Sequence, residues 1–203
     1  MSAARKTVSS QIPHPGARPA LRPAVFLDRD GVINVDTGFV FRPEDLVWMP
    51  GAAEAVRYFN CRGFLVFVVT NQSGVARGFY TEADVAALHA WMAAELAARG
   101  ARIDAFYYCP HHPEGSEPAY RLVCDCRKPA PGLIRRAFAE WPADPARSFL
   151  IGDRPSDLAA AAAAGIPGYQ FTGGNLYEFV RNISGGDGGA DSSRPLPKQH
   201  GGT

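Results

Sequence analysis

The sequence lacks the features that would assign it to a membrane or to nucleic acid. Its 21 basic and 20 acidic residues leave a formal net charge of +1, so no strong field attracts a polyanion. No apolar run approaches the roughly 20 residues of a membrane span. Residues 1–22 are polar and proline-rich, without the apolar centre of a secretory signal. We therefore expect a cytoplasmic protein with a small-molecule partner, no nucleic acid and no membrane.

Cysteine is also scarce, with four in the chain. Three of them form two tight groups with a histidine: Cys109-x-His111 and, after twelve residues, Cys124-x-Cys126. Three thiolates and one imidazole make a closed tetrahedral zinc set, which is typical of a structural site. A disulfide between Cys124 and Cys126 would be strained, and other pairings stay open. Ligand thiols suit a reducing cytoplasm, and we expect the remaining Cys61 to be a small buried residue.

Short apolar runs alternate with helical patterns, which predicts an α/β fold. We expect a Rossmann-like parallel sheet of five strands with helices on both faces, a zinc-stapled loop, and small insertions instead of a cap domain. The predicted strands are 24–27, 64–69, 103–108, 149–151 and 168–171. The predicted helices are 51–61, 81–99, 131–141 and 155–164. Thr81 and Asp84 form a plausible N-cap pair for the second helix, and Gly100 and Gly165 are plausible helix stops.

Apolar residues sufficient for a core occur only in the middle of the chain. Residues 23–181 predict one compact domain of ordinary size. Residues 1–22 and 182–203 are rich in proline, serine and glycine, and we expect both to be disordered tails. For a small domain without a cap we expect a monomer.

Two carboxylates follow the first predicted strand directly. Asp28 and Asp30 stand where open α/β sheets bind ligands, outside the carboxyl ends of the strands. Residues i and i+2 of an extended segment point the same way, so both carboxylates can face one divalent cation or one phosphate. Because Asp-x-Asp is also common in ordinary turns, this pair alone does not decide the function.

Two further strands end in polar residues at the same edge of the sheet. Residues 70–74 follow the second strand and residues 152–157 follow the fourth. Arg127 and Lys128 precede a predicted helix and offer positive charge for a phosphate. A carboxylate and a phosphate repel each other, and Mg²⁺ removes that obstacle. The combination predicts a site for phosphoryl transfer.

In order and spacing, these residues resemble the four motifs of the haloacid dehalogenase superfamily of phosphohydrolases. The resemblance spans roughly residues 24–179. It implies that Asp28 is the nucleophile, which forms an aspartyl-phosphate, and that Asp30 is the general acid and then the general base. It also implies that Thr70 and Lys128 contact the transferred phosphoryl group. The implied magnesium ligands are Asp28, Asp153 and the backbone carbonyl of Asp30.

Within that superfamily, the zinc loop is similar to that of the D-glycero-D-manno-heptose 1,7-bisphosphate 7-phosphatases. The shared pattern is Cys-Pro-His-His-Pro, a long insert, then Cys-Asp-Cys-Arg-Lys-Pro. The resemblance implies removal of the 7-phosphate in the synthesis of nucleotide-activated heptose, a step toward lipopolysaccharide. The zinc loop would aim Arg127 and Lys128 at the substrate. The substrate-binding residues that it implies are Arg29, Asp36, Thr37, Gly38, Phe39, Thr70, Asn71, Gln72, Ser73, Arg127, Lys128 and Arg154.

Two of those residues depart from the pattern of the subfamily. It more often has tyrosine at Phe39 and lysine at Arg154, so a hydroxyl is lost and an ammonium becomes a planar guanidinium. Asp157 can orient Arg154 or ligate the metal through a water, and we favour the first role. His89, in the middle of a predicted helix, is expected to be structural or solvated.

Three other functions stay open at this point. Histidinol-phosphate phosphatases are related but usually have a shorter zinc loop, and the 114–123 insert favours the heptose enzyme. A polynucleotide 3′-phosphatase would need a basic groove, which the charge balance does not support. The third alternative is a catalytically silent, zinc-stapled binding scaffold. Such a scaffold has no need of the full catalytic set, which is Asp28, Asp30, Thr70, Lys128 and Asp153.

Overall fold

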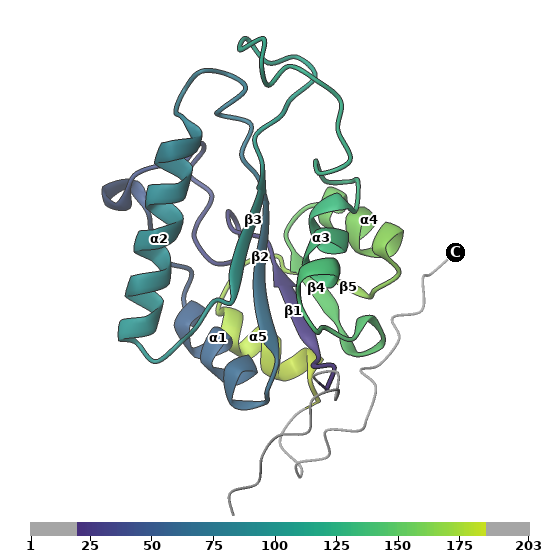
Figure 1. The fold of residues 1–203 in the computed structure, drawn as a ribbon. Helices are drawn as coiled ribbons and strands as arrows, with labels where there is room; N and C mark the ends of the chain where they lie inside the picture. The colour runs from purple at the N-terminus through teal and green to yellow at the C-terminus, as the bar shows by residue number, and fades with distance from the viewer. Residues whose placement is uncertain (1–19, 186–203) are drawn as a thin grey trace, which may run out of the picture.

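The structure is a computed structural model that describes residues 20–185 of the chain. A parallel sheet of five strands, in the order β3-β2-β1-β4-β5, forms its centre (Figure 1). The strands are β1 (Ala24–Leu27), β2 (Leu65–Asn71), β3 (Ala105–Cys109), β4 (Phe149–Gly152) and β5 (Gly168–Gln170). The helices are α1 (Ala52–Cys61), α2 (Glu82–Ala98), α3 (Gly132–Glu140), α4 (Pro155–Ala164) and α5 (Leu176–Ile183), with short 3₁₀ turns at Pro43–Asp45 and Pro145–Arg147. The predicted fold class is confirmed.

Helices cover both faces of the sheet, and β1 is buried along its whole length. Because successive strand residues point to opposite faces, Val25 and Leu27 pack on the side of α1, α2 and α5. Phe26 faces α3 and α4, where its ring lies 5.2 Å from that of Phe138. A strand with two buried faces reads as a continuous apolar run, which is why β1 is easy to recognise in the sequence.

The register of the central strands brings three loops together at one edge. Leu27 of β1 pairs with Val68 of β2 and with Ile151 of β4. The backbone N–H of Asp28 then donates to the carbonyl of Ile151 at 3.0 Å. The residues that follow β1, β2 and β4 therefore meet at the carboxyl end of the sheet, as parallel pairing requires.

Helix α5 corrects the predicted domain boundary. It runs to Ile183, beyond the limit expected at residue 181, and its Leu176 and Val180 are buried in the core. At the other end, Arg22 belongs to the fold, since its Nε donates to the carbonyl of Gly63 at 2.9 Å. Residues 1–19 and 186–203, which hold the rest of the two predicted tails, lie outside the described residues.

The expectation of a buried Cys61 is wrong, because the structure exposes this side chain. Cys61 is the last residue of α1. The helix buries Val56 and Phe59 on its core side, and a residue two positions after Phe59 points about 200° away around the helix. The thiol therefore faces solvent.

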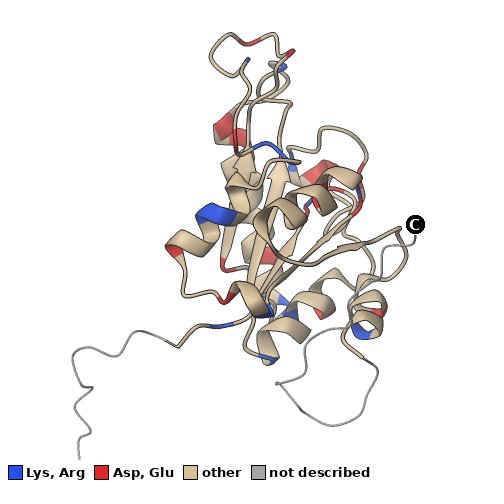
Figure 2. Ribbon diagram, turned by 90° about the vertical axis from the view of Figure 1, so that its right-hand side faces the viewer, with Lys and Arg blue, Asp and Glu red and all other residues tan. Residues whose placement is uncertain are grey.

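Two features of residues 20–185 bear on membranes and on charge. None of the helices described there combines the length and the apolar character of a membrane span. Basic segments of the described chain are short and interspersed with acidic and neutral ones (Figure 2).

The N-cap of α2 yields a first prediction. Thr81 Oγ1 accepts from the backbone N–H of Asp84 at 3.2 Å, and Asp84 Oδ2 accepts from the backbone N–H of Thr81 at 2.8 Å. We expect Thr81→Ala to lower the free energy of unfolding by about 1 kcal/mol, because the backbone N–H of Asp84 loses its acceptor. Urea denaturation measures the effect, with the exposed Thr172→Ala as the control. Equal effects of the two variants would contradict this account.

Candidate active site

The ammonium group of Lys128 lies between two carboxylates at the carboxyl end of the sheet. Its Nζ is 2.8 Å from Asp28 Oδ2 and 2.5 Å from Asp157 Oδ1, and it donates to the carbonyl of Val69 at 2.9 Å. Lys128 is only 4% exposed. Burial opposes the charged form, but the Asp28 and Asp157 carboxylates outweigh it and raise the pKa of Lys128 above its usual value. A buried, fixed positive charge is thus part of the site.

Asp28 is a buried carboxylate whose neighbours compensate its charge only in part. Burial raises its pKa to about 7, although Lys128 acts in the opposite direction. Asp28 Oδ1 accepts from the backbone N–H of Arg29 at 2.7 Å. A further cation beside Asp28 would favour its ionised form.

Three carboxylates form a cluster that fits a hard metal ion. Single oxygens of Asp28, Asp153 and Asp157 lie within 4.8 Å of one another. Asp153 Oδ1 is buried and has no hydrogen-bond partner among the described residues. A Cβ at Gly31, where φ is +86°, would meet Asp153 Oδ2, so glycine leaves the room that this carboxylate needs. Oxygen donors of this kind suit Mg²⁺.

The carboxylate of Asp30 is held by a different set of partners. It accepts from the guanidinium of Arg29 at 3.0 to 3.2 Å, from Asn34 Nδ2 at 2.9 Å and from Gln72 Nε2 at 3.0 Å. It does not belong to the three-carboxylate cluster. Donors from two loops thus fix the orientation of Asp30 beside the cluster.

Two residues predicted to bind substrate turn out to be internal supports. Arg29 is 0% exposed, and its guanidinium bonds to Asp30 and to the carbonyl of Val40 at 2.7 Å. Gln72 is 1% exposed, and its amide is bonded on both ends by neighbouring side chains. Both side chains are thus occupied by internal partners, and a substrate contact of either residue stays a prediction. Their polar groups are hydrogen-bonded to other residues of the site.

The remaining predicted residues on the loop after β1 lie near the surface. Thr37, Gly38 and Phe39 are exposed. Asp36 Oδ2 accepts from the guanidinium of Arg154 at 2.6 Å, which joins this loop to the one after β4. These residues are placed to form the rim of a site.

Residues at the end of β2 hold Lys128 in place. Asn71 Oδ1 accepts from the backbone N–H of Lys128, and Asn71 Nδ2 donates to its carbonyl, each at 3.0 Å. Thr70 is buried, and its Oγ1 accepts from Gln72 Nε2 at 2.9 Å. Ser73 is partly exposed on the following loop. The two hydrogen bonds of Asn71 clamp the Lys128 backbone to the sheet.

Asp157 has a role that the sequence interpretation did not include. Its Oδ2 accepts from the backbone N–H of Arg154 at 2.9 Å, as expected for a residue that orients Arg154. Its pairing with Lys128 was not predicted. The sequence contained an indication of it, because Asp157 lies in the first turn of α4, shortly after β4, at the same edge of the sheet as Lys128. A Cβ at Gly152 would clash with Asp157, so glycine there lets this carboxylate reach Lys128.

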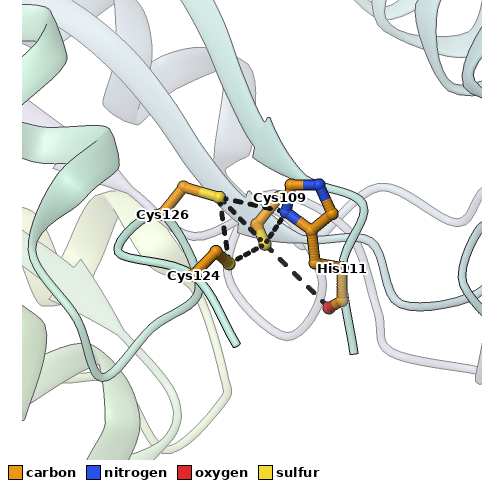
Figure 3. Close-up of side chains that lie close together, drawn as sticks. All are labelled: Cys109, His111, Cys124 and Cys126. Carbon is orange, nitrogen blue, oxygen red and sulfur yellow. Dashed lines mark hydrogen bonds between the residues drawn. The ribbon is translucent and has the colours of Figure 1, made fainter. Parts of the chain in front are cut away.

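The predicted zinc ligands converge from the end of β3 and from the loop before α3 (Figure 3). Cys126 Sγ lies 3.2 Å from the sulfurs of both Cys109 and Cys124, and 3.4 Å from His111 Nδ1. None of the cysteines in the described residues forms a disulfide. Burial raises the pKa of Cys126 to about 11 and that of Cys109 further. A set of three sulfurs and one nitrogen fits zinc, which would hold the thiols as thiolates.

The cysteine cluster is coupled directly to the residues that are predicted to bind phosphate. Cys126 immediately precedes Arg127 and Lys128 in the chain. Arg127 donates from its guanidinium to the carbonyl of His111 at 3.2 Å. Ordering this cluster therefore orders the segment that carries both cations.

His89 supports the site from α2 and is buried, as the structural interpretation expected. Its ring stacks on Phe106, with centroids 4.6 Å apart, and its Nε2 lies 3.4 Å from a guanidinium nitrogen of Arg29. Burial, reinforced by the charge of Arg29, lowers the pKa of His89 to about 3. A neutral imidazole can accept a hydrogen bond from Arg29.

Known proteins share both the sequence and the fold of this chain. A HAD-hydrolase-like family model matches residues 125–176. The D-glycero-beta-D-manno-heptose-1,7-bisphosphate 7-phosphatase of Rhodopseudomonas palustris is 55% identical over 162 residues, which are 80% of this chain and 90% of the relative. The protein of the same name from Escherichia coli K12 is 48% identical over 144 residues, 71% of this chain and 75% of the relative.

A solved structure agrees with this likeness. It is D,D-heptose 1,7-bisphosphate phosphatase from B. bronchiseptica, complexed with magnesium and phosphate. It superposes with a TM-score of 0.67 at 34% identity, over 85% of this chain and 90% of that chain.

The low pKa of His89 predicts acid sensitivity. As the pH falls below about 6.5, the unfolded chain binds a proton that the folded protein excludes, so stability falls by about 1.4 kcal/mol per pH unit. We expect His89→Gln to remove this contribution. Urea denaturation between about pH 6 and pH 4 should give a shallower slope for His89→Gln than for wild type. Thr172→Ala, at an exposed position without a titrating group, serves as control, and identical slopes for wild type and His89→Gln would refute the assignment.

Proposed function

This chain belongs to the heptose 1,7-bisphosphate 7-phosphatase family of HAD-like hydrolases, and on that premise we propose that it hydrolyses the 7-phosphate of D-glycero-D-manno-heptose 1,7-bisphosphate. The product is heptose 1-phosphate, which serves the synthesis of nucleotide-activated heptose. The observation that carries the proposal is the Lys128 ammonium held against Asp28 at 2.8 Å. We further propose that the enzyme acts as a monomer in the cytoplasm, a location that its unpaired thiols suit.

The reaction takes place in two steps on the residues of this site. Asp28 attacks phosphorus and forms an aspartyl-phosphate, while Asp30 gives its proton to the departing sugar oxygen. Asp30 then takes a proton from the water that attacks the aspartyl-phosphate, and inorganic phosphate leaves. Lys128 and the hydroxyl of Thr70 bind the phosphoryl oxygens. Charge that is fixed before the reaction is commonly the largest catalytic contribution.

Asp28 and Asp153, with the backbone carbonyl of Asp30, would hold Mg²⁺. The unpartnered, buried Asp153 Oδ1 supports this choice. When bound, the metal neutralises charge between the Asp28 carboxylate and the phosphate. Asp157 is already paired with Lys128 and contributes through that pair.

Zinc would be structural in this enzyme. Its ligands are Cys109, His111, Cys124 and Cys126, which leave no coordination position for substrate or water. The metal would fold the loop and fix Arg127 over the substrate.

The rim residues give the site its preference for a sugar bisphosphate. Asp36, Thr37, Gly38 and Phe39 face the substrate from one loop, and Asn71, Ser73, Arg127 and Arg154 complete the set. The long insert between His111 and Cys124 favours the heptose substrate over histidinol phosphate. A binding scaffold would have no need to bring Lys128 and three carboxylates into one buried cluster.

Phosphate release in the presence of Mg²⁺ tests the proposed function. The substrates are α- and β-heptose 1,7-bisphosphate, histidinol phosphate and a 3′-phosphorylated oligonucleotide. We expect the fastest release from the β anomer, which the names of the relatives specify. Preference for histidinol phosphate would refute the substrate, and silence on all four would support the scaffold alternative.

Asp28→Asn should abolish turnover. An amide is a poor nucleophile, and the substitution keeps the size of the side chain. Phosphate release and zinc content are measured together, with Asp45→Asn, an exposed residue of the first 3₁₀ turn, as control. Retained turnover with intact zinc would eliminate Asp28 as the nucleophile.

Removing zinc should raise KM roughly tenfold, which corresponds to the loss of one hydrogen bond to a charged group, about 1.5 kcal/mol. The loop from Cys109 to Cys126 would loosen and Arg127 would lose its position. Chelation and Cys126→Ser are compared by steady-state kinetics and hydrogen exchange. Cys61→Ser, at an exposed thiol, is the control. An unchanged KM after verified zinc loss would argue against the positioning role.

A further inference from the structure

A buried tyrosine hydroxyl with no assigned role is linked to the acid/base residue. Tyr80 OH donates to Gln72 Oε1 at 2.8 Å. Gln72 Nε2 in turn donates to Asp30 Oδ2 at 3.0 Å and to Thr70 Oγ1 at 2.9 Å. Tyr80 is 6% exposed. A chain of hydrogen bonds therefore runs from the loop before α2 to Asp30.

The position of Gln72 depends on both ends of its amide. Its Nε2 must point toward Asp30 and Thr70 to donate to them, which directs Oε1 toward Tyr80. Without the Tyr80 hydroxyl, Oε1 would be a buried carbonyl without a partner, which is unfavourable. Rotation of Gln72 toward another donor would relieve that cost and would release Asp30.

Packing fixes the tyrosine ring itself. The ring stacks on Phe41 with centroids 5.1 Å apart and an interplanar angle of 18°. It also lies directly over Gly74, where a Cβ would come within 2.2 Å of Tyr80 Cε1. Burial raises the pKa of Tyr80 to about 12, so the hydroxyl keeps the proton that it donates. The ring and its proton are both held in place.

We propose that Tyr80 is a positioning residue, which holds Gln72, and through it Asp30, in the orientation that proton transfer requires. The inference rests on the proposed role of Asp30 as general acid and base. Proton transfer needs the carboxyl oxygen within hydrogen-bond reach of the sugar oxygen, so a small rotation of Asp30 lowers the rate without removing any catalytic group. Nothing in the proposed mechanism otherwise requires a hydroxyl at this position.

Two substrates with different leaving groups can distinguish a positioning role of Tyr80 from a merely structural one. A sugar alkoxide needs a proton as it departs, whereas p-nitrophenolate is a stable anion and does not. Transfer of the phosphoryl group to Asp28 determines kcat/KM for either substrate if that step is irreversible. A misplaced Asp30 should therefore lower kcat/KM for the sugar substrate selectively.

The test is Tyr80→Phe, which keeps the ring and deletes the hydroxyl. We expect kcat/KM for the heptose bisphosphate to fall about 3- to 10-fold, and that for p-nitrophenyl phosphate to stay within about twofold. If p-nitrophenyl phosphate turns over too slowly to measure, acetyl phosphate replaces it, because acetate also leaves without a proton. An equal loss on both substrates, or no loss on the sugar, would overturn the proposal.

Tyr107→Phe is the matched control. Its hydroxyl donates to Glu140 at 2.8 Å and accepts from Trp141 at 3.0 Å on the edge strand β3, and it has no bond to the site. We expect it to change neither kcat/KM value. If wild type prefers another alkyl phosphate, the substrate proposal fails and the Tyr80 comparison is made on that phosphate. Silence of wild type on every phosphomonoester would overturn both proposals.

Discussion

The placement of one ammonium group between two buried carboxylates is the constraint on which the site depends. Lys128 Nζ contacts Asp28 and Asp157 at 2.8 and 2.5 Å in a part of the protein that excludes water. Removing one partner from such a buried group leaves an uncompensated charge, which commonly costs 3 to 5 kcal/mol. Lys128 can stay charged there only because β1 and α4 each supply a carboxylate at the same point. The fold and the catalytic charge are thus stabilised together.

Two separate sets of contacts fix the position of the Lys128 ammonium group. Asn71, at the end of β2, clamps the backbone of Lys128 with two hydrogen bonds. The cysteine and histidine cluster fixes the preceding segment, because Cys126 lies two residues before Lys128. The long loop is thus held at its two ends by the cysteine and histidine cluster, and between them by Tyr120, which packs against Val75, Tyr80 and Val85. The zinc that we propose would stabilise this loop from a distance, without touching the substrate.

The sequence predicts the sheet and the ends of its strands because fully buried strands are continuous apolar runs followed by polar residues. It does not predict whether a polar side chain is exposed at the site or buried beneath it, so the burial of Arg29 and Gln72 and their bonds to other site residues were not foreseen. The pairing of Asp157 with Lys128 was not predicted for the same reason, because the sequence does not show where either side chain points. Helix α5 was missed although its apolar residues recur at helical spacing, because its eight residues are fewer than the window over which that spacing identifies a helix.

The most direct test of the central claim is to find which residue becomes phosphorylated. The enzyme would be mixed with Mg²⁺ and heptose 1,7-bisphosphate, quenched in acid within a single turnover, and its peptides analysed by mass spectrometry after borohydride reduction of acyl phosphates. The account predicts a reduced, hydroxyl-bearing side chain at Asp28 and an unmodified Asp30. Modification at Asp30 instead, or turnover with no modified peptide under conditions that trap acyl phosphates, would contradict nucleophilic attack by the carboxylate that Lys128 holds.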